Sequence, residues 1–298
     1  MRKAIPILLA LAALGVAGCD DTTTSPHDVT PPAAPRGLGH VTGDTQVRLS
    51  WLANTESDVT GYRIYEAPCS SGPDCPYDRI GVTSATQFVV TGLSNGVTRY
   101  FAVSAVDRAG NESPLSLEEL FDTPRPEGHG SIGNFVNGTA GSGWDFSAAT
   151  ARDSNDPATD MYYGYNGGVF QMFATNGDRN TIPPEPDTEI QDMGYATTLD
   201  AVDYAPNAGW SPSGTVELIP GHNYVVLTKD GHFAKFRVIG VNSTIVGFDW
   251  AYQTAQGNDE LRAHPVRQGS GVPRPQPWLR SGAGPTAAVD VAPTRSSP

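Results

Sequence analysis

The sequence Gln46-Val47-Arg48-Leu49-Ser50-Trp51 alternates polar and apolar residues, which is the period of a half-buried β-strand. The pattern returns in Gly61-Tyr62-Arg63-Ile64-Tyr65 and in Phe101-Ala102-Val103-Ser104-Ala105. Residues that favour turns, namely Pro, Gly, Asn and Asp, separate these stretches. Strand signals at such intervals predict an antiparallel sandwich of roughly 90 residues and about seven strands.

The segment 31–124 resembles a fibronectin type III domain. The motifs that carry the resemblance follow one another in the family's order: Pro31-Pro32-Ala33-Ala34-Pro35 before Gly37-Leu38, Trp51, Gly61-Tyr62-Arg63-Ile64-Tyr65, Leu93-Ser94-Asn95-Gly96, Val103-Ser104-Ala105-Val106-Asp107 and Ala109-Gly110-Asn111-Glu112-Ser113. The resemblance implies an immunoglobulin-like sandwich that serves as a spacer or a binding surface. A fold of this kind does not by itself assign a function.

Cys69 and Cys75 lie in a turn-rich stretch between two strand patterns, with five residues between them. In an exported protein, such a pair predicts a disulfide that closes the tip of a hairpin. A metal or redox pair is the alternative, but a metal would need further ligands, and the loop holds no other Cys and no His.

A second β-domain is expected over residues 125–262, with the boundary near 127–131. Three strand-like runs at its end predict a three-stranded meander: 223–228, 233–241 and 245–254. Phe248, Trp250 and Tyr252 would share one face of the last run. Shorter strands are expected upstream at 144–147, 160–163 and 168–173, and the Pro- and Asp-rich stretch 178–192 is expected to be a loop.

This second domain is similar to the C-terminal β-domain of bacterial lipoproteins related to the haem-carrier haemophore HmuY. The similarity rests on Trp144-Asp145-Phe146, on residues 220–231 (Pro-Gly-His-Asn-Tyr-Val-Val-Leu-Thr-Lys-Asp-Gly) and on Phe233-Ala234-Lys235-Phe236-Arg237-Val238. It implies an envelope lipoprotein, with haem binding in some members. The residues of this chain argue against haem, because His222 and His232 would lie roughly 20 Å apart at opposite ends of one strand. A mixed site that uses Met161, Met172, Met193 or a tyrosine stays open.

The N-terminus has the pattern of an export signal. Arg2 and Lys3 precede an apolar stretch over 4–16, and Val16-Ala17-Gly18-Cys19 follows. This predicts a signal peptide over residues 1–18, since the 13 residues of this stretch are too few to span a bilayer. The segment resembles a bacterial lipoprotein signal, which implies a lipidated Cys19 and an anchor to a membrane of the cell envelope. An ordinary secreted protein is the alternative. Residues 19–30 read as a tether.

The charge excludes a nucleic-acid partner, since the chain carries 32 acidic against 19 basic residues. The acidity belongs to the two expected domains, with 11 acidic and six basic residues over 31–124 and 17 acidic and seven basic residues over 125–262.

Residues 263–298 have the composition of a disordered tail, although a frame-shifted reading would give the same change of character. The clustered oxygens of 153–160 suit calcium, but without the EF-hand spacing a solvated loop is favoured.

The residues show no nucleophile, catalytic base, cofactor motif or metal-ligand pattern in a recognisable setting. We therefore expect an all-β, lipid-anchored, non-catalytic binding or interaction protein of the cell envelope, with no cofactor, no metal and an unidentified protein, glycan or small-molecule ligand. The alternatives are a haem-binding lipoprotein, a carbohydrate-binding or glycan-processing accessory protein, and a structural spacer. Several aromatic residues could face sugar rings, although core packing explains most of them equally well: Trp144, Tyr162, Tyr163, Tyr165 and Trp210.

Overall fold

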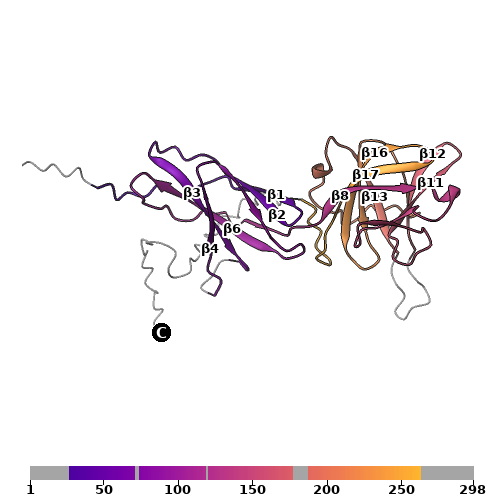
Figure 1. Ribbon diagram of the computed structural model, residues 1–298, viewed down its shortest axis with the longest axis horizontal. Coiled ribbons are helices and arrows are strands. Elements are labelled where there is room, and N and C mark those ends of the chain that lie inside the picture. Colours follow the sequence, from indigo (N-terminus) through magenta and orange to yellow (C-terminus); the bar gives the residue numbers. More distant parts are fainter. Residues whose placement is uncertain (1–26, 71–73, 119, 177–186, 263–298) are drawn as a thin grey trace, which may run out of the picture.

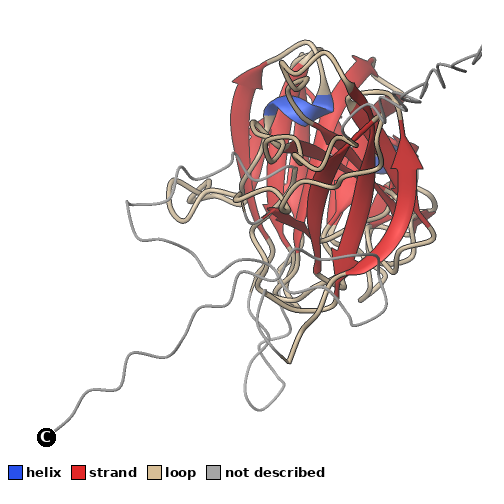
Figure 2. Cartoon of the chain, turned by 90° about the vertical axis from the view of Figure 1, so that its left-hand side faces the viewer, coloured by secondary structure: helices blue, strands red, loops and turns tan. Residues whose placement is uncertain are grey.

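The computed structural model describes residues 27–70, 74–118, 120–176 and 187–262, so the expected signal, Cys19, the start of the tether and the tail lie outside the described residues. The described chain is nearly all β, and its strands pair antiparallel in four sheets (Figures 1 and 2). The predicted fold class is confirmed. Within the described residues, we find no helix with the length and apolar character needed to cross a membrane.

The first sandwich contains a three-stranded and a four-stranded sheet. The first sheet has the order β1-β2-β5, with β1 (Gly39–Gly43), β2 (Gln46–Ser50) and β5 (Gln87–Thr91). The second has the order β4-β3-β6-β7, with β3 (Val59–Ala67), β4 (Asp78–Thr83), β6 (Arg99–Asp107) and β7 (Leu120–Asp122). The apolar residues of the alternating stretches point inward, and Trp51 packs edge-on against Tyr62 at 5.3 Å between ring centroids.

The second sandwich contains two five-stranded sheets. One has the order β10-β9-β11-β12-β14, with β9 (Gly143–Asp145), β10 (Thr150–Arg152), β11 (Met161–Asn166), β12 (Val169–Ala174) and β14 (Thr215–Glu217). The other has the order β13-β15-β16-β17-β8, with β8 (Glu127–Gly133), β13 (Glu189–Tyr195), β15 (His222–Leu227), β16 (Phe233–Val241) and β17 (Ile245–Tyr252). Two short 3-10 helices, η1 (Phe135–Asn137) and η2 (Leu199–Ala201), complete the domain.

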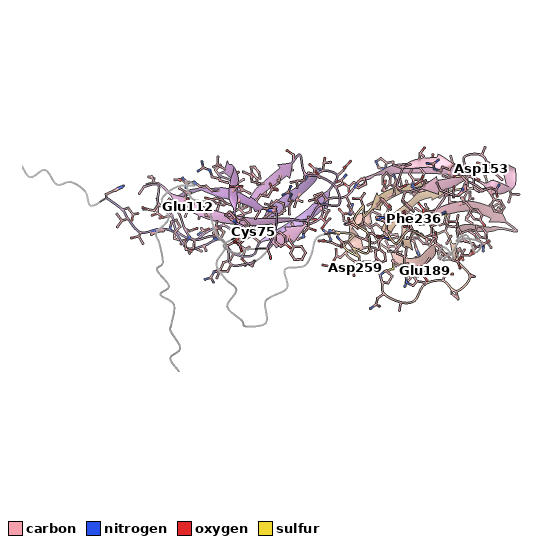
Figure 3. The ribbon with its side chains drawn as sticks, turned by 90° about the horizontal axis from the view of Figure 1, so that it is seen from below. Cys75, Glu112, Asp153, Glu189, Phe236 and Asp259 are labelled. Atoms are coloured by element: carbon pink, nitrogen blue, oxygen red, sulfur yellow. A yellow bond between two sulfur atoms is a disulfide. The ribbon has the colours of Figure 1, made fainter. Side chains whose placement is uncertain are left out.

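The predicted meander is confirmed, since β15, β16 and β17 pair in succession. Phe248, Trp250 and Tyr252 all point into one core together with residues of the facing sheet. That core lies between the two sheets, and Phe236, drawn in Figure 3, lies among its side chains. Because both inner faces are covered, the burial of this core stabilises the sandwich as one unit.

Two segments differ from expectation. Residues 127–133, which include the expected boundary, form the edge strand β8 paired with β17. Glycine allows β8 to pair closely with β17, because a Cβ on Gly130 would lie 2.7 Å from the Phe248 ring. The aromatic ring of β17 fills the space that a side chain at position 130 would need, so β8 lacks a large apolar residue there. The expected loop 178–192 was wrong at its end, because residues 189–192 begin β13, which pairs with β15. Residues 177–186 are not described.

The sandwiches meet around residues 123–126, between β7 and β8 (Figure 1). The Arg125 side chain is fully buried there. Its Nε donates to the carbonyl of Leu261 at 2.8 Å, and its Nη1 donates to Glu127 at 2.9 Å. Its backbone amide donates to the carbonyl of Gly43 in the first sandwich at 3.3 Å. One residue of the linker therefore bonds to both sandwiches.

Candidate functional site: an aromatic face on the second sandwich

Strands β11 and β12 place aromatic rings on the side of their sheet that faces away from the core. Met161, Tyr163 and Met172 point into the core, so strand alternation turns Tyr162 and Phe173 outward. These two residues are directly opposed in the antiparallel register, and their rings stack with centroids 5.0 Å apart and planes 10° apart. Both side chains remain partly exposed.

Phe135 of η1 completes this group, which we call the aromatic face: Phe135, Tyr162 and Phe173. The Phe135 ring stands edge-on to Tyr162 at 5.3 Å and to Phe173 at 5.9 Å. It lies over Gly164, where a Cβ would come within 2.5 Å of the ring. The absence of a side chain at Gly164 therefore lets the ring rest on the sheet. The side chain of Asn134 caps η1 by accepting from the amide of Val136, which fixes the start of this turn.

Polar side chains border the aromatic face along neighbouring strands. Thr215 lies opposite Phe173, and Glu217 lies opposite Gln171, so hydroxyl, amide and carboxylate groups line one side. The Tyr162 hydroxyl can donate as well as accept, because a tyrosine is neutral at physiological pH and burial raises the pKa of Tyr162 further. Apolar ring faces bordered by a few hydrogen-bonding groups match a ligand with apolar C–H surfaces and hydroxyl groups, which is the chemistry of a sugar ring.

The other sheet of the sandwich has its outer face covered by the chain itself. Lys235 of β16 points away from the core, yet its side chain is fully buried. Its Nζ donates to the carbonyl of Val202 at 2.9 Å, which shows that the segment around Val202 lies over it. Arg237 on the same strand donates to the carbonyl of Ala196 at 3.0 Å. Burial lowers the pKa of Lys235, and the nearby Arg125 lowers it further. The two outer faces thus differ, because one is closed by residues 196–205 and the other presents partly exposed aromatic rings.

The structure divides the five aromatic residues that the sequence singled out. Trp144 and Tyr163 belong to the core, and Tyr165 packs against it. Trp210 packs beside Val225 under the covered sheet. Tyr162 lies on the aromatic face, while Phe135 and Phe173 were missed. Positions 161, 163 and 165 alternate along the sequence and all carry large apolar or aromatic residues. Taking these three positions as the inner face would have placed Tyr162 on the outer face.

The candidate haem ligands do not form a common site in the described structure. His222 begins β15 and its Nδ1 lies 3.0 Å from both carboxylate oxygens of Asp192. His232 follows the same strand, and its Nδ1 lies 3.1 Å from the carbonyl of Gln253. Met161 and Met172 are buried in the core, whereas Met193 is exposed on β13. Both histidines therefore have local partners, and the described positions of these side chains supply no support for a haem site.

A disulfide joins Cys69 and Cys75, with 5.9 Å between their Cα atoms. It lies at the tip of the β3–β4 hairpin, as the spacing of the two cysteines indicated. Cys75 is buried in a small apolar cluster with Tyr65, Ala67 and Tyr77, so the bond also holds the loop against the sheet (Figure 3). Cys19, the predicted lipidation site, lies outside the described residues and stays a prediction.

The carboxylates of the acidic loop 153–160 accept hydrogen bonds from the loop itself and from residues that flank it. Asp153 accepts from the Thr139 hydroxyl at 2.8 Å and from the amide of Asn155 at 2.9 Å. These backbone and side-chain hydrogen bonds hold the pKa of Asp153 below its ordinary value. Asp156 accepts from the amide of Ala158 and lies 3.5 Å from an Arg152 nitrogen. The contacts are those of a hydrogen-bonded turn.

Comparison with known families matches residues 33–119 to the fibronectin type III domain. The first sandwich is therefore a fibronectin type III domain. Three relatives illustrate where such sequences occur. Exoglucanase B of Cellulomonas fimi is 28% identical over 263 residues, which is 84% of this chain and 22% of the relative. Chitinase Chi52 of Paenibacillus xylanexedens is 37% identical over 139 residues, 41% of this chain and 24% of the relative. An amylopullulanase of Thermoanaerobacterium saccharolyticum is 35% identical over 112 residues, which is 37% of this chain and 8% of the relative.

The chain spans less than a quarter of the length of these relatives. Among solved structures, a fibronectin type III-like protein from Clostridium thermocellum is 28% identical and covers 32% of this chain and 96% of its own, with a TM-score of 0.27. The fibronectin type III domain of this chain thus has homologues within glycoside hydrolases.

Proposed function

We propose that this protein is a non-catalytic accessory protein of the cell envelope that binds polysaccharide through the aromatic face of its second sandwich. The observation that carries the proposal is the placement of Phe135, Tyr162 and Phe173 on the solvent side of a sheet whose other side forms the core. Rings in that position add nothing to the burial of the core. An aromatic cluster at the surface is typical of a binding site.

The relatives support the choice of a polysaccharide as ligand. Exoglucanase, chitinase and amylopullulanase are enzymes named for polysaccharides, and each contains a region similar to part of this chain. Within the proposal, the fibronectin type III domain acts as a spacer that carries the second sandwich.

A binding role suits the aromatic face better than hydrolysis. Hydrolysis of a glycosidic bond ordinarily requires two facing carboxyl groups. The described elements that carry or border the aromatic face, η1, β11, β12 and β14, contain one carboxylate, that of Glu217. A single acidic group beside stacked rings can orient a sugar by hydrogen bonding.

Localisation forms part of the proposal. A lipidated Cys19 followed by the tether would hold the two sandwiches at a membrane of the cell envelope, where polysaccharides are accessible. In cells supplied with a tagged fatty acid, we expect label on the wild-type protein and none on the Cys19→Ser variant. Equal labelling of both proteins would contradict the anchor and would leave the binding proposal standing.

Retention on insoluble polysaccharide tests the binding function. The full chain with Cys19→Ser is mixed with cellulose, chitin and starch, and the unbound fraction is measured. We expect retention on at least one polymer and about tenfold weaker binding for Tyr162→Ala, equivalent to about 1.4 kcal/mol. Tyr195→Ala, which removes a 71% exposed tyrosine from the other sheet, is the matched control and should bind as the parent does. No retention on any polymer would refute the proposal.

A further inference from the structure

Three ligand-type side chains converge at the contact between the two sandwiches. His40 lies on β1 and Asp122 ends β7, whereas Glu260 comes from the segment after β17. His40 Nε2 lies 3.9 Å from Asp122 Oδ2 and 4.0 Å from Glu260 Oε1. All three ligand atoms lie within 4.8 Å of one another. Asp259, next to Glu260, lies at the end of the second sandwich that faces the first (Figure 3).

The two carboxylate oxygens that face His40 have no hydrogen-bond partner among the described residues. Asp122 is 0% exposed and Glu260 is 3% exposed, so bulk solvent does not reach these oxygens. The other oxygen of Asp122 accepts from the Thr42 hydroxyl at 2.8 Å, which fixes the carboxylate with its free oxygen toward His40. A buried carboxylate oxygen without a partner is costly, so such a pair calls for a positive group between them.

Arg125 is a fixed positive group that attracts both carboxylates, but its hydrogen bonds point elsewhere. Its Nε and Nη1 donate to Leu261 and Glu127, and its Nη2 lies 3.9 Å from Asp200. It attracts both carboxylates through space without bonding to the oxygens that face His40. Among the described residues, no positive side chain is therefore hydrogen-bonded to the carboxylate oxygens that face His40.

We propose that His40, Asp122 and Glu260 form a binding site for one zinc ion between the two sandwiches. A point equidistant from the three ligand atoms lies about 2.5 Å or less from each of them, given these separations. Bonds from zinc to nitrogen and oxygen ligands are about 2.0–2.2 Å long, so a small inward movement of the side chains completes the coordination. One imidazole and two carboxylates suit zinc better than calcium or magnesium, which prefer six or more oxygen ligands. The residue pattern indicated no metal, because positions 40, 122 and 260 are far apart in the sequence.

Zinc at this position would join the two domains. Two ligands belong to the fibronectin type III domain and the third to the second sandwich, so coordination would resist their separation. The inference is independent of polysaccharide binding, since the aromatic face contains none of the three ligands.

Zinc binding to the full chain tests the site. Zinc chloride is titrated into untagged, metal-free protein that carries Cys19→Ser in every sample, so that this thiol contributes no ligand. We expect one ion per chain, and binding at least tenfold weaker in His40→Gln and in Glu260→Gln. His222→Gln removes one member of a His–Asp pair that offers only two ligands, and it should bind as the parent does.

Absence of zinc binding by the parent, or unchanged affinity in both His40→Gln and Glu260→Gln, would overturn the site. Retention of calcium in preference to zinc would overturn the choice of metal. Circular dichroism first establishes that each variant is folded. If neither variant folds, X-ray absorption spectroscopy of the zinc-loaded parent identifies the ligands. We expect one imidazole together with oxygen ligands. A sulfur ligand or two imidazoles would contradict the site.

Discussion

At the scale of single residues, Gly164 determines how closely Phe135 approaches the sheet. A Cβ at this position would lie 2.5 Å from the Phe135 ring and 2.9 Å from that of Phe173, so Gly164→Ala must displace at least one ring. Because both rings are partly exposed, they can move outward, and we expect only about 1 kcal/mol of destabilisation. Polysaccharide retention should nevertheless fall severalfold. Retention equal to that of the parent would show that the position of Phe135 does not matter for binding.

Asp160 provides a residue-scale prediction about pH. Its carboxylate is buried and accepts from the amide of Phe146 at 2.9 Å. Burial, together with the charges of Asp145 and Asp230, raises the pKa of Asp160 to about 7. In the unfolded chain the carboxyl ionises near pH 4, so between about pH 4 and 7 the folded state holds a proton that the unfolded chain has lost. The stabilisation is complete below about pH 4 and is lost as the pH rises to about 7.

The Asp160→Asn substitution removes this ionisation and keeps an oxygen that can accept from Phe146. The variant should gain stability relative to the wild type as the pH rises from about 4 to 7, by on the order of 4 kcal/mol, and the difference should level off above that range. Urea unfolding midpoints at successive pH values measure it. A difference that is constant across the range would contradict the raised pKa.

At the scale of elements, the disulfide is expected to stabilise one hairpin. Cys69 and Cys75 close a short loop between β3 and β4, and a cross-link of this length contributes about 2 kcal/mol. In Cys69→Ser/Cys75→Ser, hydrogen exchange should accelerate in the β3–β4 hairpin while the second sandwich exchanges at its wild-type rate. Acceleration in the second sandwich would show that the hairpin has a wider role. Free thiols in the exported protein would show that the bond does not form in the cell.

The elements also show how far the sequence could predict the structure. Strands with large apolar residues at alternate positions could be predicted from the sequence. In β17, for example, the alternation of Phe248, Trp250 and Tyr252 indicates which face is buried. Strand β8 was not recognised, since its glycines leave space for rings that belong to β17. The start of β13 resembled a loop, because polar residues surround Ile190 and the strand contains a bulge between Asp192 and Gly194.

The same physical reason limits the prediction of sites. The aromatic face joins η1 to β11 and β12, so Phe135 acquires its role only from the fold. Lys235 could not be predicted to be buried, because residues 199–205 cover it from outside its own strand. The contact of His40 with Glu260 likewise depends on how two domains meet. Local periodicity carries no information about such contacts.

At the scale of the whole molecule, Arg125 links the two sandwiches. Its side chain is 0% exposed and its removal would leave the carbonyl of Leu261 without its donor. We expect Arg125→Ala to lower the free energy of unfolding by about 3 kcal/mol and to separate the unfolding of the two domains into two transitions in calorimetry. Arg262→Ala is the matched control, since that side chain is partly exposed and should contribute about 1 kcal/mol or less. A single unchanged transition in Arg125→Ala would contradict this role.

The central claim is that the aromatic face binds polysaccharide, and affinity electrophoresis with two neighbouring substitutions tests it most directly. Phe135 belongs to the aromatic face, whereas the adjacent Val136 is 60% exposed and contributes no ring. The soluble form of the retained polysaccharide is cast into the gel, and the dissociation constant follows from the retardation of each protein. We predict that Phe135→Ala binds about tenfold more weakly than the wild type and that Val136→Ala binds equally well. Equal retardation of Phe135→Ala and the wild type would contradict the account.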